Sequence, residues 1–262
     1  MGPVNYDSAL WRGLFHFGVC MEAPLRWQES YEQLRAAPDE QQLFARIAEF
    51  AKKLGFEYCC YGIRVPLPVS NPAVAIFDTY PSGWMKHYQE SRFIAIDPTV
   101  REGMSTSKLI VWPDASGASN APQLWGDAHD FGLRVGVAQS SWAAHGVYGL
   151  LTMARHADPL TSAEIDELTL QASWLANLSH ALMSEFLVPR LAPEASVVLT
   201  PRESEVLCWT GEGKTACEIG QILNISERTV NFHVNNVLLK LNATNKVQAV
   251  VKAVAMGLIS SY

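Results

Sequence analysis

The stretch Thr200–Leu241, TPRESEVLCWTGEGKTACEIGQILNISERTVNFHVNNVLLKL, contains the start signals of three successive helices. Its opening TPRE combines an N-capping threonine, a proline suited to the first helical position and a glutamate that completes a capping box. Thr215–Glu218 is a second capping box, and Ser226 is a suitable N-cap for a helix that follows a short turn. The pattern predicts a helix-turn-helix preceded by a supporting helix.

The last of these helices has two different faces. Apolar residues at i, i+4, i+7, i+8 and i+11 form a stripe that we expect to be buried: Val230, Val234, Val237, Leu238 and Leu241. Arg228, Asn231 and Asn235 lie on the opposite side. Asparagine can pair bidentately with adenine, and arginine can reach guanine or phosphate, so this face suits the major groove of DNA. A small helical module that binds protein is the alternative that the spacing leaves open.

A further helix, predicted over Lys246–Met256, completes a four-helix, all-α domain at 198–262. This domain has six basic and five acidic residues, so its net charge is +1. The rest of the chain has a net charge of −7, which gives the total of −6. One copy would bind DNA weakly, because affinity depends on neutralising phosphates. We therefore expect a homodimer on a palindromic site. The residues expected to contact DNA are Arg228, Thr229, Asn231, His233, Asn235, Lys240 and Lys246.

Three segments of this domain, LTPRESEVL, GEGKTACEIG and ISERTVNFHV, resemble the DNA-binding domain of the LuxR family. The resemblance covers the last quarter of the chain, and Glu203, Leu207 and Gly213 fall on positions that the family shares. The family often has lysine or arginine where this chain has Asn231 and Asn235. The resemblance therefore implies the fold and leaves the base preference open.

Residues 1–187 have the pattern of a separate α+β domain, followed by a linker at 188–197 that contains two prolines. We predict strands over 56–65, 73–80, 109–112, 135–144 and 147–155, and helices over 22–34, 41–54, 84–91, 123–131 and 161–187. Close strand pairs indicate an antiparallel sheet, and helices from both ends of the domain can cover its two faces. The predicted architecture is an N-terminal α-β-α sandwich joined to the helix-turn-helix domain.

The long helix predicted over 161–187 begins with a third capping box, TSAE. Its apolar residues recur at intervals of about seven residues or half that distance: Leu168, Ala172, Leu175, Leu182 and Phe186. Two interpretations stay open, a helix packed on its own sheet and a seam between two copies.

Several aromatic and polar residues of the first domain are candidates for a small-molecule site. Trp84 and Tyr88 are i, i+4 neighbours on one helix face, and Asp97 follows the apolar run FIAI. A carboxylate there can accept a hydrogen bond from a buried N–H, while Trp84 and the hydroxyls of Tyr80 and Thr152 can donate to carbonyls. Together they suit an amide flanked by carbonyls, with apolar walls for a chain.

Each candidate also has a purely structural explanation. Asp97-Pro98 is a suitable N-cap and first-turn pair, and the aromatic side chains, including Trp112, can belong to a core. Thr152 is an ordinary strand residue. Residue types and spacing alone leave both explanations open.

The segments YPSGWMKHY, FIAIDPTV, LIVWPD, FGLRVG and GLLTMAR resemble, in this order, the autoinducer-binding domain of LuxR-type receptors. The resemblance implies an N-acyl-homoserine lactone as ligand. By position, Trp84 would bond the lactone carbonyl, Asp97 the amide N–H, and Tyr80 and Thr152 the acyl carbonyl. The remaining ligand contacts implied are Tyr88 and Trp112 as walls and Thr99 near the head group. LVPRLAPE and GKTACEIG are most similar to the QscR-type receptors, which implies a receptor without its own synthase.

The sequence argues against several other classes. No apolar run approaches the ~20 residues that span a bilayer, and no signal peptide is recognisable, so we expect a cytoplasmic protein. The five cysteines form no CxxC motif and have no histidine at metal spacing, so we expect reduced thiols, no metal and no cofactor.

We therefore expect a ligand-responsive transcription factor, with DNA, an acyl-homoserine lactone, a second copy and RNA polymerase as partners. The alternatives are an enzyme that processes the lactone and a phosphorylation-controlled response regulator. Against an enzyme, none of the seven histidines pairs with a nucleophile in a recognisable local motif, and neither GxSxG nor HxHxD occurs. Against a receiver domain, the first domain lacks a β-α alternation.

Overall fold

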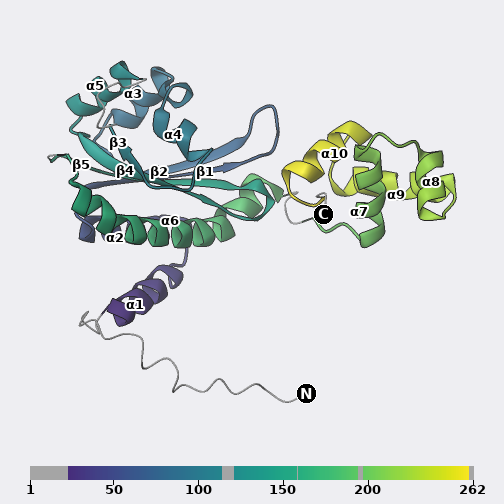
Figure 1. The fold of residues 1–262 in the computed structure, drawn as a ribbon, viewed down its shortest axis with the longest axis horizontal. Coiled ribbons are helices and arrows are strands. Elements are labelled where there is room, and N and C mark those ends of the chain that lie inside the picture. The colour runs from purple at the N-terminus through teal and green to yellow at the C-terminus, as the bar shows by residue number, and fades with distance from the viewer. Residues whose placement is uncertain (1–22, 114–120, 158, 194–196, 260–262) are drawn as a thin grey trace, which may run out of the picture.

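A computed structural model describes residues 23–113, 121–157, 159–193 and 197–259. The first domain is built on a five-stranded antiparallel sheet in the order β2-β1-β5-β4-β3 (Figure 1). Its strands are β1 Tyr58–Val65, β2 Ala73–Asp78, β3 Ile110–Trp112, β4 Val135–Trp142 and β5 Tyr148–Arg155. The sheet and the helical C-terminal region confirm the predicted fold class.

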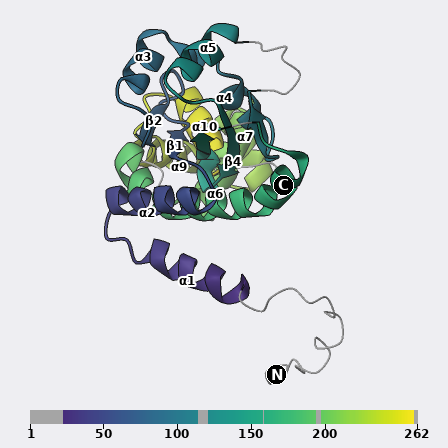
Figure 2. The ribbon, with the colours of Figure 1, turned by 90° about the vertical axis from the view of Figure 1, so that its left-hand side faces the viewer.

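Helices cover both faces of this sheet. On one face lie α1 Ala23–Arg35, α2 Glu40–Lys53 and α6 Ser162–Leu191, and Figure 2 shows α2 and α6 together beneath the sheet. On the other lie α3 Trp84–Glu90, the short helix η1 Phe93–Ala95, α4 Pro98–Gly103 and α5 Pro122–Asp130 (Figure 1). A further short helix, η2 Ala144–Gly146, connects β4 to β5. No helix among the described residues is long and apolar enough to cross a membrane.

Strand alternation directs each residue to one of the two faces. In β1, Tyr61 and Ile63 are buried in the core beneath the sheet, with residues of α2 and α6. On β5, Tyr148 and Leu150 belong to a second core with Trp84 on the opposite face. The sheet therefore separates the core that includes α2 and α6 from the layer that contains α3, α4 and α5.

The long helix differs from the prediction at its C-terminal end. Its apolar stripe packs on the sheet. Leu168, Ala172 and Leu175 are buried in the core beneath the sheet, and Leu182 and Phe186 are partly buried against that core. The helix does not end near Leu187 but continues through Pro189 to Leu191. A proline removes one backbone donor, and burial of Leu187 and Ala192 on either side holds the chain in place. The first residues of the predicted linker are therefore helical.

The C-terminal domain has the predicted helices, α7 Pro201–Gly211, α8 Ala216–Leu223, α9 Glu227–Lys240 and α10 Lys246–Ala255. The capping boxes at Thr200 and Thr215 are both formed. The turn between α8 and α9 is tight, because a Cβ at Gly220 would lie 2.7 Å from the carbonyl oxygen of Ile225. The predicted stripe on α9 is buried, except that Leu238 is only partly so.

Glu203 links two of these helices. Its side chain is 4% exposed, accepts from the Thr200 backbone N–H and lies 2.6 Å from the Lys240 ammonium of α9. Burial alone would raise the pKa of Glu203, but the hydrogen bonds from Lys240 and Thr200 outweigh it and hold the pKa below 4.5. The capping hydrogen bonds likewise lower the pKa of Glu218. At Glu164, the capping hydrogen bonds from Thr161 and a hydrogen bond from Arg155 lower the pKa to about 2.

These carboxylates make stability depend on pH. A pKa that is lower in the folded state adds stability above the unfolded value of 4.5, and that stability is lost as the pH falls through the folded pKa. We expect Glu203→Gln, which keeps a capping acceptor but loses the ion pair, to lower the free energy of unfolding by about 1–3 kcal/mol at neutral pH. The deficit should shrink as the pH falls below 4.5 and through the lowered folded-state pKa of Glu203.

Urea unfolding at a series of pH values measures this change. Glu205→Gln is the matched control, because Glu205 pairs with Arg202 on the surface and such pairs contribute at most about 1 kcal/mol. An equal loss in both variants would show that the buried position of Glu203 adds nothing.

Candidate functional site

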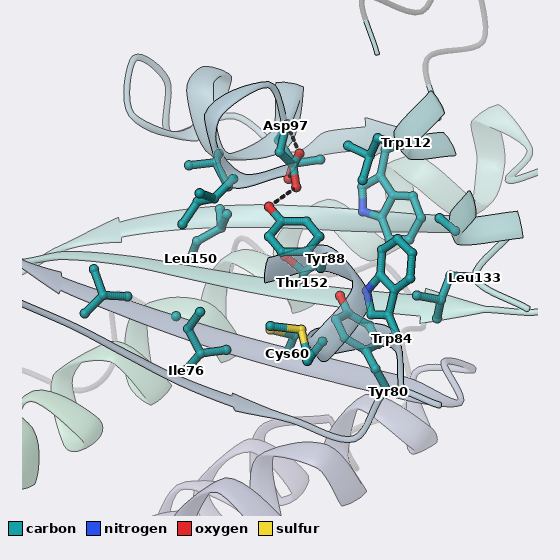
Figure 3. A pocket seen from close by; sticks show the side chains of 18 of the residues that line it. Cys60, Ile76, Tyr80, Trp84, Tyr88, Asp97, Trp112, Leu133, Leu150 and Thr152 are labelled. Carbon is teal, nitrogen blue, oxygen red and sulfur yellow. Dashed lines mark hydrogen bonds between the residues drawn. The ribbon is translucent and has the colours of Figure 1, made fainter. Parts of the chain in front are cut away.

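A cavity lies between the sheet and the helices α3, α4 and α5 (Figure 3). The empty space between its lining residues amounts to about 980 Å³, a figure that includes solvent at its open side. All seven residues predicted for a small-molecule site line it: Tyr80, Trp84, Tyr88, Asp97, Thr99, Trp112 and Thr152. The structure thus gathers residues that are far apart in the sequence around one space.

Asp97 both caps a helix and lines the cavity. Its Oδ1 accepts from the backbone N–H and the hydroxyl of Thr99, at 2.8 and 2.7 Å, and so caps α4. Its Oδ2 accepts from the Tyr88 hydroxyl at 2.8 Å. Burial and the neighbouring carboxylate raise the pKa of Tyr88, so the phenol stays protonated and keeps donating. The two explanations that the sequence left open for Asp97 are therefore compatible.

Aromatic packing fixes the wall opposite the sheet. Trp84 follows Gly83, whose φ of 89° is a conformation that glycine adopts readily. The Trp84 indole packs against the rings of Tyr88 and Phe131. His87 Nε2 lies 2.7 Å from Asp127 Oδ2 and so joins α3 to α5. Figure 3 shows the Trp84 nitrogen and the Tyr80 hydroxyl on the cavity side of their rings. Burial raises the pKa of Tyr80, which keeps this hydroxyl a donor.

Trp112 forms the end of the cavity from β3. Its ring stacks on Trp125 of α5 at a centroid distance of 5.4 Å and an angle of 15°. The ring lies against Gly136 of β4 so closely that a Cβ there would collide with it. Glycine at this position therefore makes room for the tryptophan.

The residues that form the floor of the cavity were not among those predicted from the sequence. They include Cys60, Gly62 and Arg64 of β1, Ile76 of β2, and Tyr148 and Leu150 of β5. The signal was present in the alternation of each strand, since Tyr148, Leu150 and Thr152 are two residues apart. Which strand pairs with β5, and in which register, could not be read from one chain.

The chemistry of the cavity is that of binding. A carboxylate acceptor and the donors Trp84, Tyr80 and Thr152 line a cavity whose other walls are mainly apolar. Such a set suits a molecule with an amide and carbonyls at one end and a hydrocarbon chain at the other. Among the described residues, no group of three or more His, Cys, Asp or Glu side chains is placed to hold a metal ion.

The second candidate surface lies on α9. Arg228, Asn231 and Asn235 line one shallow depression together with Phe232, which is 59% exposed and was missed by the sequence analysis. His233 is half-buried, with its ring against Phe232. The structure therefore brings the two asparagines and the arginine to one face.

The other predicted DNA contacts are placed differently. The hydroxyl of Thr229 lies 2.8 Å from Ser226 Oγ in the N-cap of α9. The Lys240 ammonium pairs with Glu203 and also donates to the Val198 carbonyl, so it does not join the face of Arg228. Lys246 is exposed at the start of α10.

Two family models match successive parts of the chain. Residues 39–183 match the model of the autoinducer binding domain, and residues 197–253 match that of the bacterial regulatory proteins of the luxR family. The transcriptional activator protein SolR of Ralstonia nicotianae is 69% identical over 233 residues, which are 89% of this chain and 98% of SolR. The quorum-sensing regulator RhlR of Pseudomonas aeruginosa is 35% identical over 90% of this chain and 97% of its own.

A solved structure of SdiA in complex with octanoyl-rac-glycerol superposes with a TM-score of 0.78 at 31% identity, covering 94% of this chain and all of that one. The two family models match successive parts of the chain, and the SdiA structure shares its fold. The chain therefore belongs to the LuxR family of bacterial quorum-sensing transcriptional regulators, with an autoinducer-binding domain followed by a helix-turn-helix DNA-binding domain.

Proposed function

We propose that the cavity binds an N-acyl-homoserine lactone and that the liganded chain binds a palindromic promoter site as a homodimer in the cytoplasm. One observation supports the ligand most strongly: a single cavity combines a carboxylate acceptor, three donors and apolar walls. On DNA, the dimer would contact RNA polymerase. The lactone is bound and released unchanged.

The ligand's polar groups match the residues of the cavity one by one. Trp84 donates to the lactone carbonyl, and Tyr80 and Thr152 donate to the acyl carbonyl. A carboxylate has about four acceptor directions, and Tyr88 and Thr99 use three of those of Asp97. The remaining direction accepts the ligand's amide N–H, while Tyr88 and Trp112 form walls and Thr99 holds the carboxylate in place.

One contact between the domains and one exposed helix face support coupling. The connection between β4 and β5 lies against the last helix, because a Cβ at Gly146 would come within 2.8 Å of the Ala255 carbonyl oxygen. On the outer side of the same helix, Val247, Val251 and Val254 are 73%, 41% and 59% exposed and share one face. Exposed apolar side chains in such a row suit a second copy of the helix, so α10 is our candidate for the dimer contact.

The ligand is tested by expressing the chain with and without N-octanoyl-homoserine lactone. We expect the intact lactone to co-purify, and a ligand at 100 times its Kd to add about 2.7 kcal/mol to the free energy of unfolding. Mass spectrometry of the released molecule and thermal unfolding measure both effects. Recovery of a ring-opened or deacylated product would contradict binding without turnover, and unfolding unchanged by the lactone would contradict the proposed ligand.

The dimer contact is tested by Val251→Asp. A charge on the outer face of α10 should separate the copies and lower affinity for a palindromic site roughly tenfold or more, because half of the phosphate contacts are lost. Lactone binding should not change. Val69→Asp is the control, since Val69 is 55% exposed in the β1–β2 loop, and sedimentation with DNA-binding titrations measures the outcome. Intact dimers in Val251→Asp would contradict the role of α10.

A further inference from the structure

Gly62 leaves a gap in the floor of the cavity. It lies in the middle of β1, on the face that lines the cavity, and its neighbours across the sheet are Ile76 of β2 and Leu150 of β5. A Cβ built on Gly62 meets no atom within 4 Å. The space that its side chain would fill is therefore part of the cavity, although its backbone is that of an ordinary strand.

The register of β1 and β5 sets the distance from the polar groups to this gap. Cys60 pairs with Thr152, Gly62 with Leu150 and Arg64 with Tyr148. Two strand residues span about 7 Å, so Gly62 lies about 7 Å, and Arg64 about 13 Å, beyond the level of Thr152. A hydrocarbon chain advances less than ~1.5 Å per carbon. A chain whose carbonyl is held at Thr152 therefore needs at least about five carbons to reach Gly62 and about nine to reach Arg64.

The cavity opens to solvent through aliphatic side chains. Four of its lining residues are substantially exposed, at 46%, 38%, 51% and 44%: Val74, Ile76, Ile94 and Met104. We call these four residues the aliphatic rim. Exposed aliphatic groups gain when another apolar group covers them, and each methylene buried raises affinity about fourfold. A chain long enough to cover the aliphatic rim should therefore bind with higher affinity.

We propose that the acyl chain runs over Gly62 toward the aliphatic rim, and that Gly62 is the residue that determines which chain lengths bind. The inference rests on the proposed acyl-homoserine lactone and narrows it to lactones whose chains have at least about five carbons beyond the carbonyl, enough to reach Gly62. Gly62 admits such chains because it has no side chain, and the rim, being open, sets no sharp upper limit. A four-carbon chain ends before Gly62 and makes neither contact.

The test compares butanoyl- and decanoyl-homoserine lactone in the full chain. Wild type should bind the decanoyl lactone at least 100-fold more tightly, since several additional methylenes are buried. Gly62→Val places a side chain in the gap and should weaken the decanoyl lactone at least tenfold, with butanoyl affinity unchanged within about twofold. Valine suits a strand, and Gly62→Ala should show a smaller loss in the same direction.

Gly126→Ala is the matched control for Gly62→Ala. Gly126 lies on the exposed side of α5, where an added Cβ also meets nothing within 4 Å, but outside the cavity. Its affinities for both lactones should equal those of wild type. Equal losses for both lactones in the Gly62 variants, no loss at all, or a wild-type preference for butanoyl would overturn the role of Gly62. If wild type bound neither lactone, the proposed function would fail instead.

Discussion

Asp97→Asn should reduce the affinity for an acyl-homoserine lactone by roughly 30- to 1,000-fold, which corresponds to about 2–4 kcal/mol. Asparagine is as good an N-cap as aspartate, so the hydrogen bond from the Thr99 backbone N–H, and with it α4, should be kept. The amide has only one acceptor oxygen, which Thr99 and Tyr88 already compete for. The ligand's N–H then faces an NH₂ group in place of an acceptor.

The measurement is lactone affinity by competition, together with ligand-dependent thermal stability. Asp39→Asn is the matched control, because Asp39 caps α2 in the same way, accepting from the Gln42 backbone N–H at 2.7 Å, but lies away from the cavity. We expect the control to bind like wild type. Normal lactone affinity in Asp97→Asn would show that this carboxylate serves as a helix cap alone.

Asn231→Ala should reduce discrimination between the preferred DNA site and its variants by about 1–3 kcal/mol per half-site, or roughly 5- to 150-fold. Asn231 lines the depression on α9 beside Arg228 and Asn235, where a side chain can meet the edges of bases. The loss should be specific to one or two base positions, because a base contact specifies while a phosphate contact only positions. Lactone binding should not change.

Binding to a library of site variants measures this loss, with Lys246→Ala for comparison. Lys246 is exposed at the start of α10, so its loss should weaken all sequences alike and reduce the dependence of affinity on salt. A uniform loss in Asn231→Ala would contradict base recognition and identify a phosphate contact.

Local signals predicted much of this structure. The three capping boxes, the helix-turn-helix and the strands follow from neighbouring residues, and all were found within a few positions of their predicted ends. The resemblance to the autoinducer-binding domain indicated seven ligand-binding residues, and the fold places all seven around one cavity. The continuation of α6 through Pro189 was not predictable, because burial on both sides of a proline outweighs its local preference.

The cavity floor depends on non-local pairing. Gly62 in the sequence is an ordinary strand glycine, and only the register with Leu150 places its missing side chain in an open space. The role of Lys240 also depends on a distant residue. Its position on a DNA-binding helix predicts a DNA contact, but the fold places it beside Glu203, 37 positions earlier in the chain. Chemistry that depends on one strand or helix can be read from the sequence, whereas chemistry shared between distant segments needs the fold.

The central claim is that a ligand in the first domain controls DNA binding by the second. The most direct measurement is the affinity of the full chain for a palindromic site, selected from random duplexes, with and without N-octanoyl-homoserine lactone. We expect the lactone to change the affinity of wild type at least tenfold and that of Asp97→Asn hardly at all. Equal affinity of wild type with and without the lactone, at concentrations where binding of the lactone is demonstrated, would contradict the account.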